Sequence, residues 1–111
     1  MTRDDQQRIA DMIEVADQIA ELVDRGHSAF SSDIAVRFAI ERLLEILGEA
    51  ANSVSAATRD RFPEVPWSDV SRLRIVLAHH YHRVDPDQVW AMATHDVPAL
   101  ASGLRRNGPQ A

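Results

Sequence analysis

Cysteine and lysine are both absent from this chain of 111 residues. The lack of cysteine excludes disulfide bonds, a thiolate nucleophile and any metal site built on cysteine. All 12 basic residues are arginine, a bias that we attribute to genome composition rather than to selection for phosphate binding. No apolar run approaches the roughly 18 residues that span a bilayer, and the opening Met-Thr-Arg-Asp-Asp contains no apolar signal region. We therefore expect a cytoplasmic protein that does not contact a membrane.

The amino-acid composition is that of a globular protein. Apolar residues make up 45% and charged residues 26% of the chain, which is typical of a folded domain. The length suits one domain with a modest core, so we predict a single domain over residues 1–111 with an ordered core over about residues 4–105. The formal net charge of −5 argues against a general nucleic-acid coat protein, but it permits a small nucleic-acid site.

Hydrophobic periodicity predicts one helix near the start of the chain and another that begins at residue 67. Apolar residues recur at steps of three and four over residues 3–24, and Gly26 is a natural stop for this first helix. Residues 58–66 contain two prolines, so residues 59–65 are predicted as a connection with one short turn. A further helix is then predicted over residues 67–80.

The longest predicted helix lies between these two, over residues 32–55. Ser31 or Ser32 is its expected N-cap, with Asp33 in its first turn. Its middle is apolar on more than one stripe, which indicates that it covers both its own core and a second subunit. Gly48 is unfavourable inside a helix, and we interpret it as permitting the close approach of another helix.

The last helix has the clearest start in the sequence. Asp85 supplies an N-cap acceptor, Pro86 occupies the first helical position and Gln88 the capping-box position. Pro98 is expected to kink or interrupt this helix. No alternating segment typical of a strand is present. Four helices with short connections predict an all-α fold, an antiparallel four-helix up-and-down bundle.

The reactive side chains concentrate in residues 74–81, Arg-Ile-Val-Leu-Ala-His-His-Tyr. Arg74 offers a permanently charged planar group that matches phosphate oxygens. His79 can take and give protons near neutral pH, and Tyr81 adds a hydroxyl group that can bind, donate or be modified. No acidic residue lies within residues 70–84, so this stretch is locally positive in an acidic protein. The combination favours phosphodiester chemistry.

Helical geometry separates two of these groups. Arg74 and His79 are five residues apart and point about 140° away from each other on an ideal helix. They share a site only if the helix ends before His79 and turns the imidazole back, or if the two groups meet through the second chain of a dimer. The N-cap at Asp85 requires the helix to end near His82, which favours a distorted last turn.

Several segments, taken together in order, resemble the HepT-like toxins of the HEPN superfamily over roughly residues 5–104. Arg-x4-His alone would be a weak signature, but its combination with the flanking motifs is specific. The segments are Gly48-Glu49-Ala50-Ala51, Pro63-x-x-Pro66-Trp67, Arg74-x4-His79-x-Tyr81 and the run Val-Asp-Pro-Asp-Gln-Val-Trp at residues 84–90.

The resemblance implies a HEPN-like homodimer that cleaves RNA without a metal or other cofactor. It assigns the ribonuclease site to Arg74 and His79. It also implies a type VII-like toxin–antitoxin pair, in which the partner is a minimal nucleotidyltransferase antitoxin that AMPylates Tyr81. Arg74 would stabilise charge on the scissile phosphate while His79 acts as general acid or base in a cleavage that uses the RNA 2′-hydroxyl.

Supporting or substrate-binding roles are assigned to further polar residues of the same region. These residues are Arg72, His80, His82, Arg83 and Glu49. Glu41, Glu45 and Glu49 recur at four-residue steps and are interpreted as a solvated stripe, in which Glu49 is the one that could face the cleft and orient Arg74.

Each assignment has a structural alternative. Arg74 could pair with Glu49 and simply join two helices, and Tyr81 could be an ordinary helix-end aromatic. His79 and His82 have the spacing of a metal chelate, but no acidic ligand lies in the run, so no metal site is predicted. Ile75 stands where the family commonly has a polar residue, and His80 where it often has glycine. The alternative function is therefore a non-catalytic nucleotidyltransferase-binding subunit, or a degenerate toxin without nuclease activity.

Overall fold

The computed structural model describes residues 1–78 and 85–107. Over these ranges the chain is helical and contains no strand, so the predicted all-α class is confirmed. The helices are α1 (Arg3–Val23), α2 (His27–Ser32), α3 (Ile34–Ser53), α4 (Ala56–Arg59), α5 (Trp67–Ala78), α6 (Pro86–Ala91), the π-helical segment η1 (Met92–Asp96) and α7 (Val97–Asn107). None of these described helices is both long enough and apolar enough to cross a bilayer.

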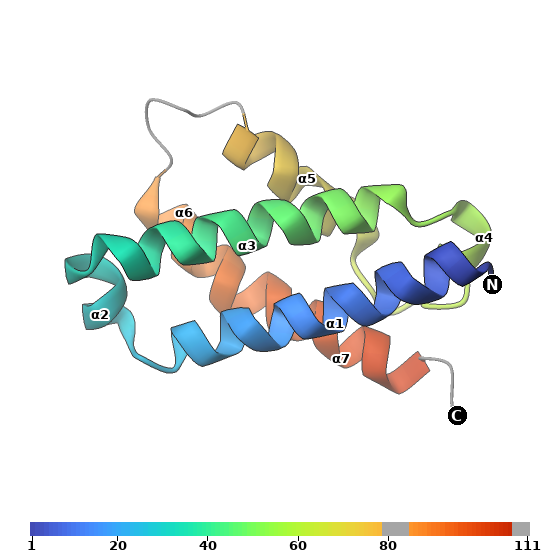
Figure 1. Cartoon of the computed structure of the whole chain (residues 1–111), viewed down its shortest axis with the longest axis horizontal. Helices are drawn as coiled ribbons and strands as arrows, with labels where there is room; N and C mark the ends of the chain where they lie inside the picture. The colour runs from blue at the N-terminus through green and yellow to red at the C-terminus, as the bar shows by residue number, and fades with distance from the viewer. Residues whose placement is uncertain (79–84, 108–111) are drawn as a thin grey trace.

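Helix α3 lies at the centre of the arrangement. It packs against α1 on one side and α5 on the other, and α1 also packs against α7 (Figure 1). The apolar faces of these helices meet in one buried cluster. Its largest fully buried side chains are Phe62, Ile9, Met12, Ile19, Ile40, Leu44, Leu47, Leu73, Leu100, Leu104, Val70 and Val89. Burial of such side chains contributes roughly 1.5–3 kcal/mol each relative to exposure, and it ties every long helix to α3 or α1.

The start of α3 differs from the prediction. Asp33 is the N-cap, in an extended conformation, and its Oδ1 accepts a hydrogen bond from the Ala35 backbone N–H at 2.9 Å. Ser31 and Ser32 belong instead to the short helix α2, where the Ser32 hydroxyl donates to the Ser28 carbonyl oxygen. The expected serine cap was therefore wrong. The carboxylate of Asp33 caps equally well, and its extended backbone separates α3 from the short helix α2, which the sequence did not predict.

The last helical region is continuous but changes its winding before Pro98. Asp85 caps α6 as predicted, with Pro86 at the first position and the Asp87 backbone N–H donating to Asp85 Oδ1 at 2.9 Å. The backbone N–H of Val97 then reaches back to the Met92 carbonyl, a π-helical bond. Proline lacks an N–H and its ring crowds the carbonyl four residues earlier. The wider π turn accommodates this, so Pro98 changes the local winding where an interruption was expected.

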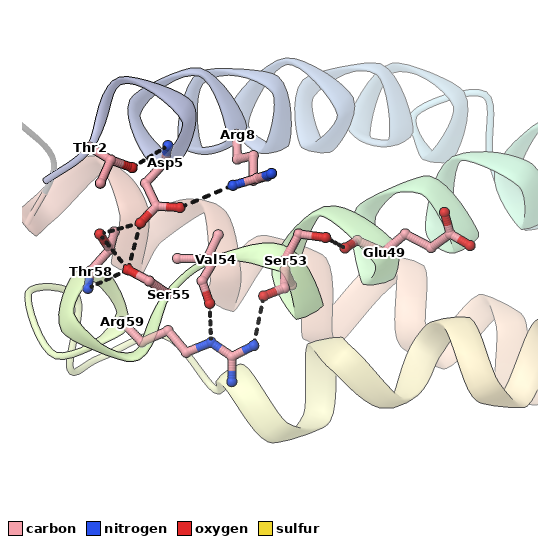
Figure 2. Close-up of polar contacts among 10 residues, drawn as sticks. Thr2, Asp5, Arg8, Glu49, Ser53, Val54, Ser55, Thr58 and Arg59 are labelled. Carbon is pink, nitrogen blue, oxygen red and sulfur yellow. Dashed lines mark hydrogen bonds and ion pairs between the residues drawn. The ribbon is translucent and has the colours of Figure 1, made fainter.

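A buried carboxylate fastens the start of α1 to the segment that follows α3. Asp5 is only 2% exposed and accepts hydrogen bonds from the hydroxyls of Ser55, at 2.6 Å, and Thr58, at 2.7 Å (Figure 2). Arg8 lies 3.3 Å from the other carboxylate oxygen. The two hydroxyl donors, the Ser55 backbone and Arg8 lower the pKa of Asp5 from 3.8 to about 2.

Arg59 closes the neighbouring end of α3. Its Nε donates to the Val54 carbonyl at 3.1 Å and a terminal nitrogen donates to the Ala51 carbonyl at 2.9 Å (Figure 2). The same guanidinium lies over the ring of Trp67, 5.6 Å from its centroid. Trp67 is the first residue of α5. Arg59 therefore donates to two carbonyls at the end of α3, of which that of Ala51 also accepts the Val54 backbone N–H, and it links the end of α3 to the start of α5.

The lowered pKa of Asp5 predicts an acid-sensitive contribution to stability. Because the folded value is depressed, the contribution is fully present above the unfolded value near 3.8 and is lost as pH falls towards 2. Asp5→Asn should lower the melting temperature at pH 6 and flatten its dependence on pH between about 4 and 2. Thermal unfolding followed by circular dichroism measures both effects. Asp4→Asn, at an exposed neighbouring position, is the matched control, and an equal flattening there would contradict the assignment.

Candidate active site

Helix α5 carries the first of the candidate catalytic residues, Arg74. The helix begins directly after Pro66, and the Trp67 indole N–H donates to the Phe62 carbonyl at 3.1 Å. Val70, Leu73 and Leu77 turn into the core. These residues share one face at helical spacing, which leaves Arg74 at the edge of that face, beside α3.

Gly48 sets how closely α5 approaches α3. A Cβ atom at Gly48 would stand 2.7 Å from the backbone nitrogen of Arg74, and 3.2 Å from both the Arg74 Cβ and the Val70 carbonyl oxygen. Cβ atoms essentially never lie 2.7 Å from a backbone nitrogen, so a side chain at Gly48 would force one of the two helices to shift. The predicted close approach of another helix at Gly48 is confirmed, and the helix is α5 at the position of Arg74.

The Arg74 guanidinium has no partner within residues 1–78 and 85–107. Its Nε is buried without a hydrogen bond, and no ion pair joins the side chain to any of the described acidic groups. Arginine has five N–H donors and stays charged at all ordinary pH values. Burying such N–H donors without a hydrogen-bond acceptor lowers the stability of the fold. Arg74 is therefore a positioned cation with donor capacity for an anionic ligand.

Glu49 does not pair with Arg74. Its side chain is exposed, and its backbone carbonyl accepts a hydrogen bond from the Ser53 hydroxyl at 3.0 Å (Figure 2). The alternative in which an Arg74–Glu49 ion pair joins two helices is therefore not what the described structure contains.

The other two glutamates of the predicted stripe on α3 are less exposed than Glu49. Glu41 is partly buried and lies 3.3 Å from Arg37, and Glu45 is partly buried and lies 2.6 Å from Arg42. Burial raises the pKa of the Glu41 carboxyl, and the positive charge of Arg37 opposes the shift. Of the three, Glu49 is exposed and the other two are partly exposed and paired. The predicted stripe is therefore solvated at Glu49 and only partly so at Glu41 and Glu45.

Arg72 lies in different surroundings from Arg74. It is exposed and pairs with Asp69, and both line a cavity of about 540 Å³ with His95 and Asp96. Burial and then the negative charge of Asp69 raise the pKa of the Asp96 carboxyl. The structure therefore does not bring Arg72 together with Arg74, and its assigned supporting role stays a prediction.

The remaining candidates lie outside the described residues. They are His79, His80, Tyr81, His82 and Arg83. Their roles stay predictions from the sequence. Among residues 1–78 and 85–107 no group of three or more histidine or acidic side chains could hold a metal ion.

Sequence reasoning missed Ser71. Its hydroxyl oxygen is buried without a hydrogen-bond partner, like Arg74 Nε three residues further along α5. Residues three apart are neighbours on one helix surface, so two unsatisfied polar atoms occur side by side at this edge. A serine inside a helix carries no signal of this in the sequence, because the absence of a partner depends on what packs around it.

Ile75 is exposed beside Arg74. Its side chain is 46% exposed, and among the described residues Ile34, Phe38 and Ile46 of α3 are the other large apolar side chains left open to solvent. Three of the four lie on the helix that was predicted to face a second subunit.

The chain belongs to the ribonuclease HepT-like family, whose model matches residues 12–106. It is 33% identical over 99 residues to a Methanocaldococcus jannaschii protein named "Putative RNase MJ1380", covering 88% of this chain and 91% of that one. It is also 33% identical over 92 residues to "Probable ribonuclease HepT" of Thermococcus cleftensis, covering 83% and 82% of the two chains. No solved structure matches the chain significantly. Family and fold class thus agree with the resemblance drawn from the motifs.

The contact at Gly48 predicts how the site responds to a single methyl group. Gly48→Ala should destabilise the fold by about 1–3 kcal/mol, because a backbone nitrogen cannot move aside as a side chain can, and it should displace Arg74. Gly103→Ala is the matched control, since a Cβ there would first meet the Val65 Cγ2 methyl, at 2.9 Å, away from Arg74. Urea unfolding gives the stability of both variants. If Gly48→Ala cleaves RNA as fast per folded molecule as the wild type, a role of Gly48 in placing Arg74 is contradicted.

Proposed function

We propose that this protein is a metal-independent endoribonuclease, the toxin of a toxin–antitoxin pair, and that Arg74 and His79 perform the cleavage. The observation that carries the proposal is the buried Arg74 Nε, which has no hydrogen-bond partner among residues 1–78 and 85–107, at the α3–α5 contact of a chain of the HepT-like family. The names of the relatives support the activity, since they describe those proteins as ribonucleases.

The proposed reaction uses a nucleophile that RNA itself provides. The 2′-hydroxyl oxygen attacks the adjacent phosphorus, the bond from phosphorus to the 5′-oxygen breaks, and the products are a 2′,3′-cyclic phosphate and a free 5′-hydroxyl. One proton leaves the 2′-hydroxyl and one is delivered to the departing oxygen. His79 performs one of these transfers, a role worth about 10²–10⁴-fold in rate. Arg74 neutralises the charge that develops on the phosphate oxygens, which a metal ion would otherwise do.

The proposal includes a homodimer built from up-and-down four-helix bundles. The exposed apolar side chains Ile34, Phe38 and Ile46 of α3 support it, because clustered apolar residues on a surface mark interaction sites. A dimer also answers the geometric difficulty that Arg74 and His79 do not share a helix face, since two chains bring two copies of each group to one cleft.

We also propose that a minimal nucleotidyltransferase antitoxin neutralises the toxin by AMPylating Tyr81. The phenolic oxygen attacks the α-phosphorus of ATP, pyrophosphate leaves, and the tyrosine proton passes to solvent. The attached phosphate would place a negative charge two residues from His79. That charge repels the RNA backbone and competes for Arg74.

A non-catalytic nucleotidyltransferase-binding subunit is the second candidate. Ile75 favours it, because an isoleucine that is 46% exposed stands beside Arg74 where the family commonly has a polar residue. An apolar side chain there offers no hydrogen bond to substrate. The two candidates differ in whether purified protein cleaves RNA.

Cleavage of RNA in the presence of EDTA tests the function. Purified protein should cut a mixed-sequence RNA in EDTA, and His79→Ala and Arg74→Ala should each reduce the rate by at least about 10²-fold. Arg74→Lys should retain little of the cleavage activity, because lysine lacks the planar guanidinium group of arginine. Arg106→Ala, which removes an exposed arginine paired with Glu64 on another surface, is the control for lost positive charge. Cleavage that survives in both site variants would rule out the assignment, and no cleavage by the wild type would favour the non-catalytic candidate.

Modification of Tyr81 has its own test, made simple because Tyr81 is the only tyrosine. Incubation with a cognate nucleotidyltransferase and ATP should add mass in AMP units, measured by intact-protein mass spectrometry, and should abolish RNA cleavage. Tyr81→Phe should take up no AMP and stay active in the presence of the antitoxin. If Tyr81→Phe gains the same mass as the wild type, the modification is elsewhere.

A further inference from the structure

A row of carboxylates runs along one edge of α1, far in sequence from the candidate site. Residues 9–24 contain five acidic residues and no basic one. Four of these lie at steps of three, four and three, which places them on one edge of the helix. They are Glu14, Asp17, Glu21 and Asp24, and all are exposed. Asp17 pairs with Arg105, whereas the other three have no ion pair in the described part of the chain.

A groove of about 660 Å³ lies next to this acidic edge, between α1 and the η1–α7 segment. Small apolar side chains from both walls line it. They are Ala16, Ala20 and Val23 of α1 and Ala93, Val97 and Ala101 of the opposite wall. Asp17 and Asp24 form part of the α1 wall, and Arg105 and Arg106 part of the other. The Asp17–Arg105 ion pair therefore spans the groove. Asp24 lies farther along α1, and its carboxylate has no ion pair in the described part of the chain.

We propose that this α1–α7 groove docks a basic amphipathic helix of a protein partner. The α1 wall extends from Ala16 to Asp24, about 12 Å or just over two helical turns. That length suits the apolar stripe of a docked helix, as in helix-in-groove recognition. Arginine or lysine residues at steps of three and four on the incoming helix match the spacing of the carboxylates on α1.

Charge decides against the two other possible occupants. RNA carries phosphates that the free carboxylates of Glu14, Glu21 and Asp24 would repel. A second copy of this chain offers Arg105 and Arg106 at the same surface, but these already pair with Asp17 and Glu64. Of the three carboxylates without an ion pair in the described part of the chain, Asp24 lines the groove, and Glu14 and Glu21 lie on the same edge of α1 outside its lining. A cationic helix from another protein, with long basic side chains that extend over the rim, is the occupant that gains most from them.

A synthetic helix provides a defined probe. The probe is a capped, fluorescein-labelled peptide of about five turns, made of alanine and leucine on one face and lysine on both flanks. A second peptide replaces each lysine with glutamate. Fluorescence anisotropy should show saturable binding of the lysine peptide that weakens as salt is added, and at least about tenfold weaker binding of the glutamate peptide.

Two pairs of matched variants locate the binding. Ala20→Trp fills the groove and should weaken binding at least about tenfold, whereas Ala10→Trp, also at an exposed position of α1 but outside the groove, should change it less than about twofold. The combination Glu21→Gln with Asp24→Asn should weaken binding more than Asp4→Asn with Asp11→Asn, although both remove two charges. Circular dichroism verifies that each variant is folded.

The inference is overturned by any of three results. These are equal binding of both peptides, equal losses in the groove variants and their controls, and conversion of a dimer to a monomer by Ala20→Trp in light scattering, which would make a second copy the occupant. RNA cleavage measured on the same samples should be unchanged by Ala20→Trp. Failure of the docking proposal is thereby separated from failure of the proposed nuclease function.

Discussion

The close contact between α3 and α5 at Gly48 fixes the place of the candidate catalytic cation. Because the missing Cβ lets backbone meet backbone, with an ideal Cβ falling 2.7 Å from the Arg74 nitrogen, main-chain packing positions the Arg74 backbone, and the side chain has no partner among residues 1–78 and 85–107. Arg59 secures the neighbouring ends of the same two helices, through the carbonyls that end α3 and the ring of Trp67. The position of the Arg74 backbone thus follows from the packing of two helices, which is stiffer than a surface ion pair.

The uneven distribution of charge reconciles an acidic protein with an RNA substrate. Residues 9–24 carry five acidic groups and no basic one, whereas residues 70–84 carry three arginines and no acidic group. A polyanion responds to the local potential rather than to the net charge of −5. The proposed RNA substrate would therefore be repelled from the outer edge of α1 and attracted to the stretch of residues 70–84. The same separation leaves the α1–α7 groove available to a cationic protein.

The sequence predicts the long helices well because their signals are local. The first was expected over residues 3–24 and is Arg3–Val23, and the cap at Asp85 is where the pattern placed it. The short helix α2 was missed, since six residues depend on packing more than on propensity. The π-helical turn before Pro98 was missed as well, because proline only shows that a regular bond is lost and the surrounding packing decides how the helix adapts.

The alternative pairing of Arg74 with Glu49 fails for a reason that the geometry of α3 makes clear. Gly48 faces α5, and the next residue of a helix points about 100° away, so Glu49 turns to solvent. The spacing of these residues can be read from the sequence. Which side chains the contact at Gly48 keeps apart becomes clear only once the helix that meets Gly48 is known. A buried Nε without a partner reduces stability. Within residues 1–78 and 85–107 nothing offsets this cost, and the proposed anionic ligand of Arg74 would do so.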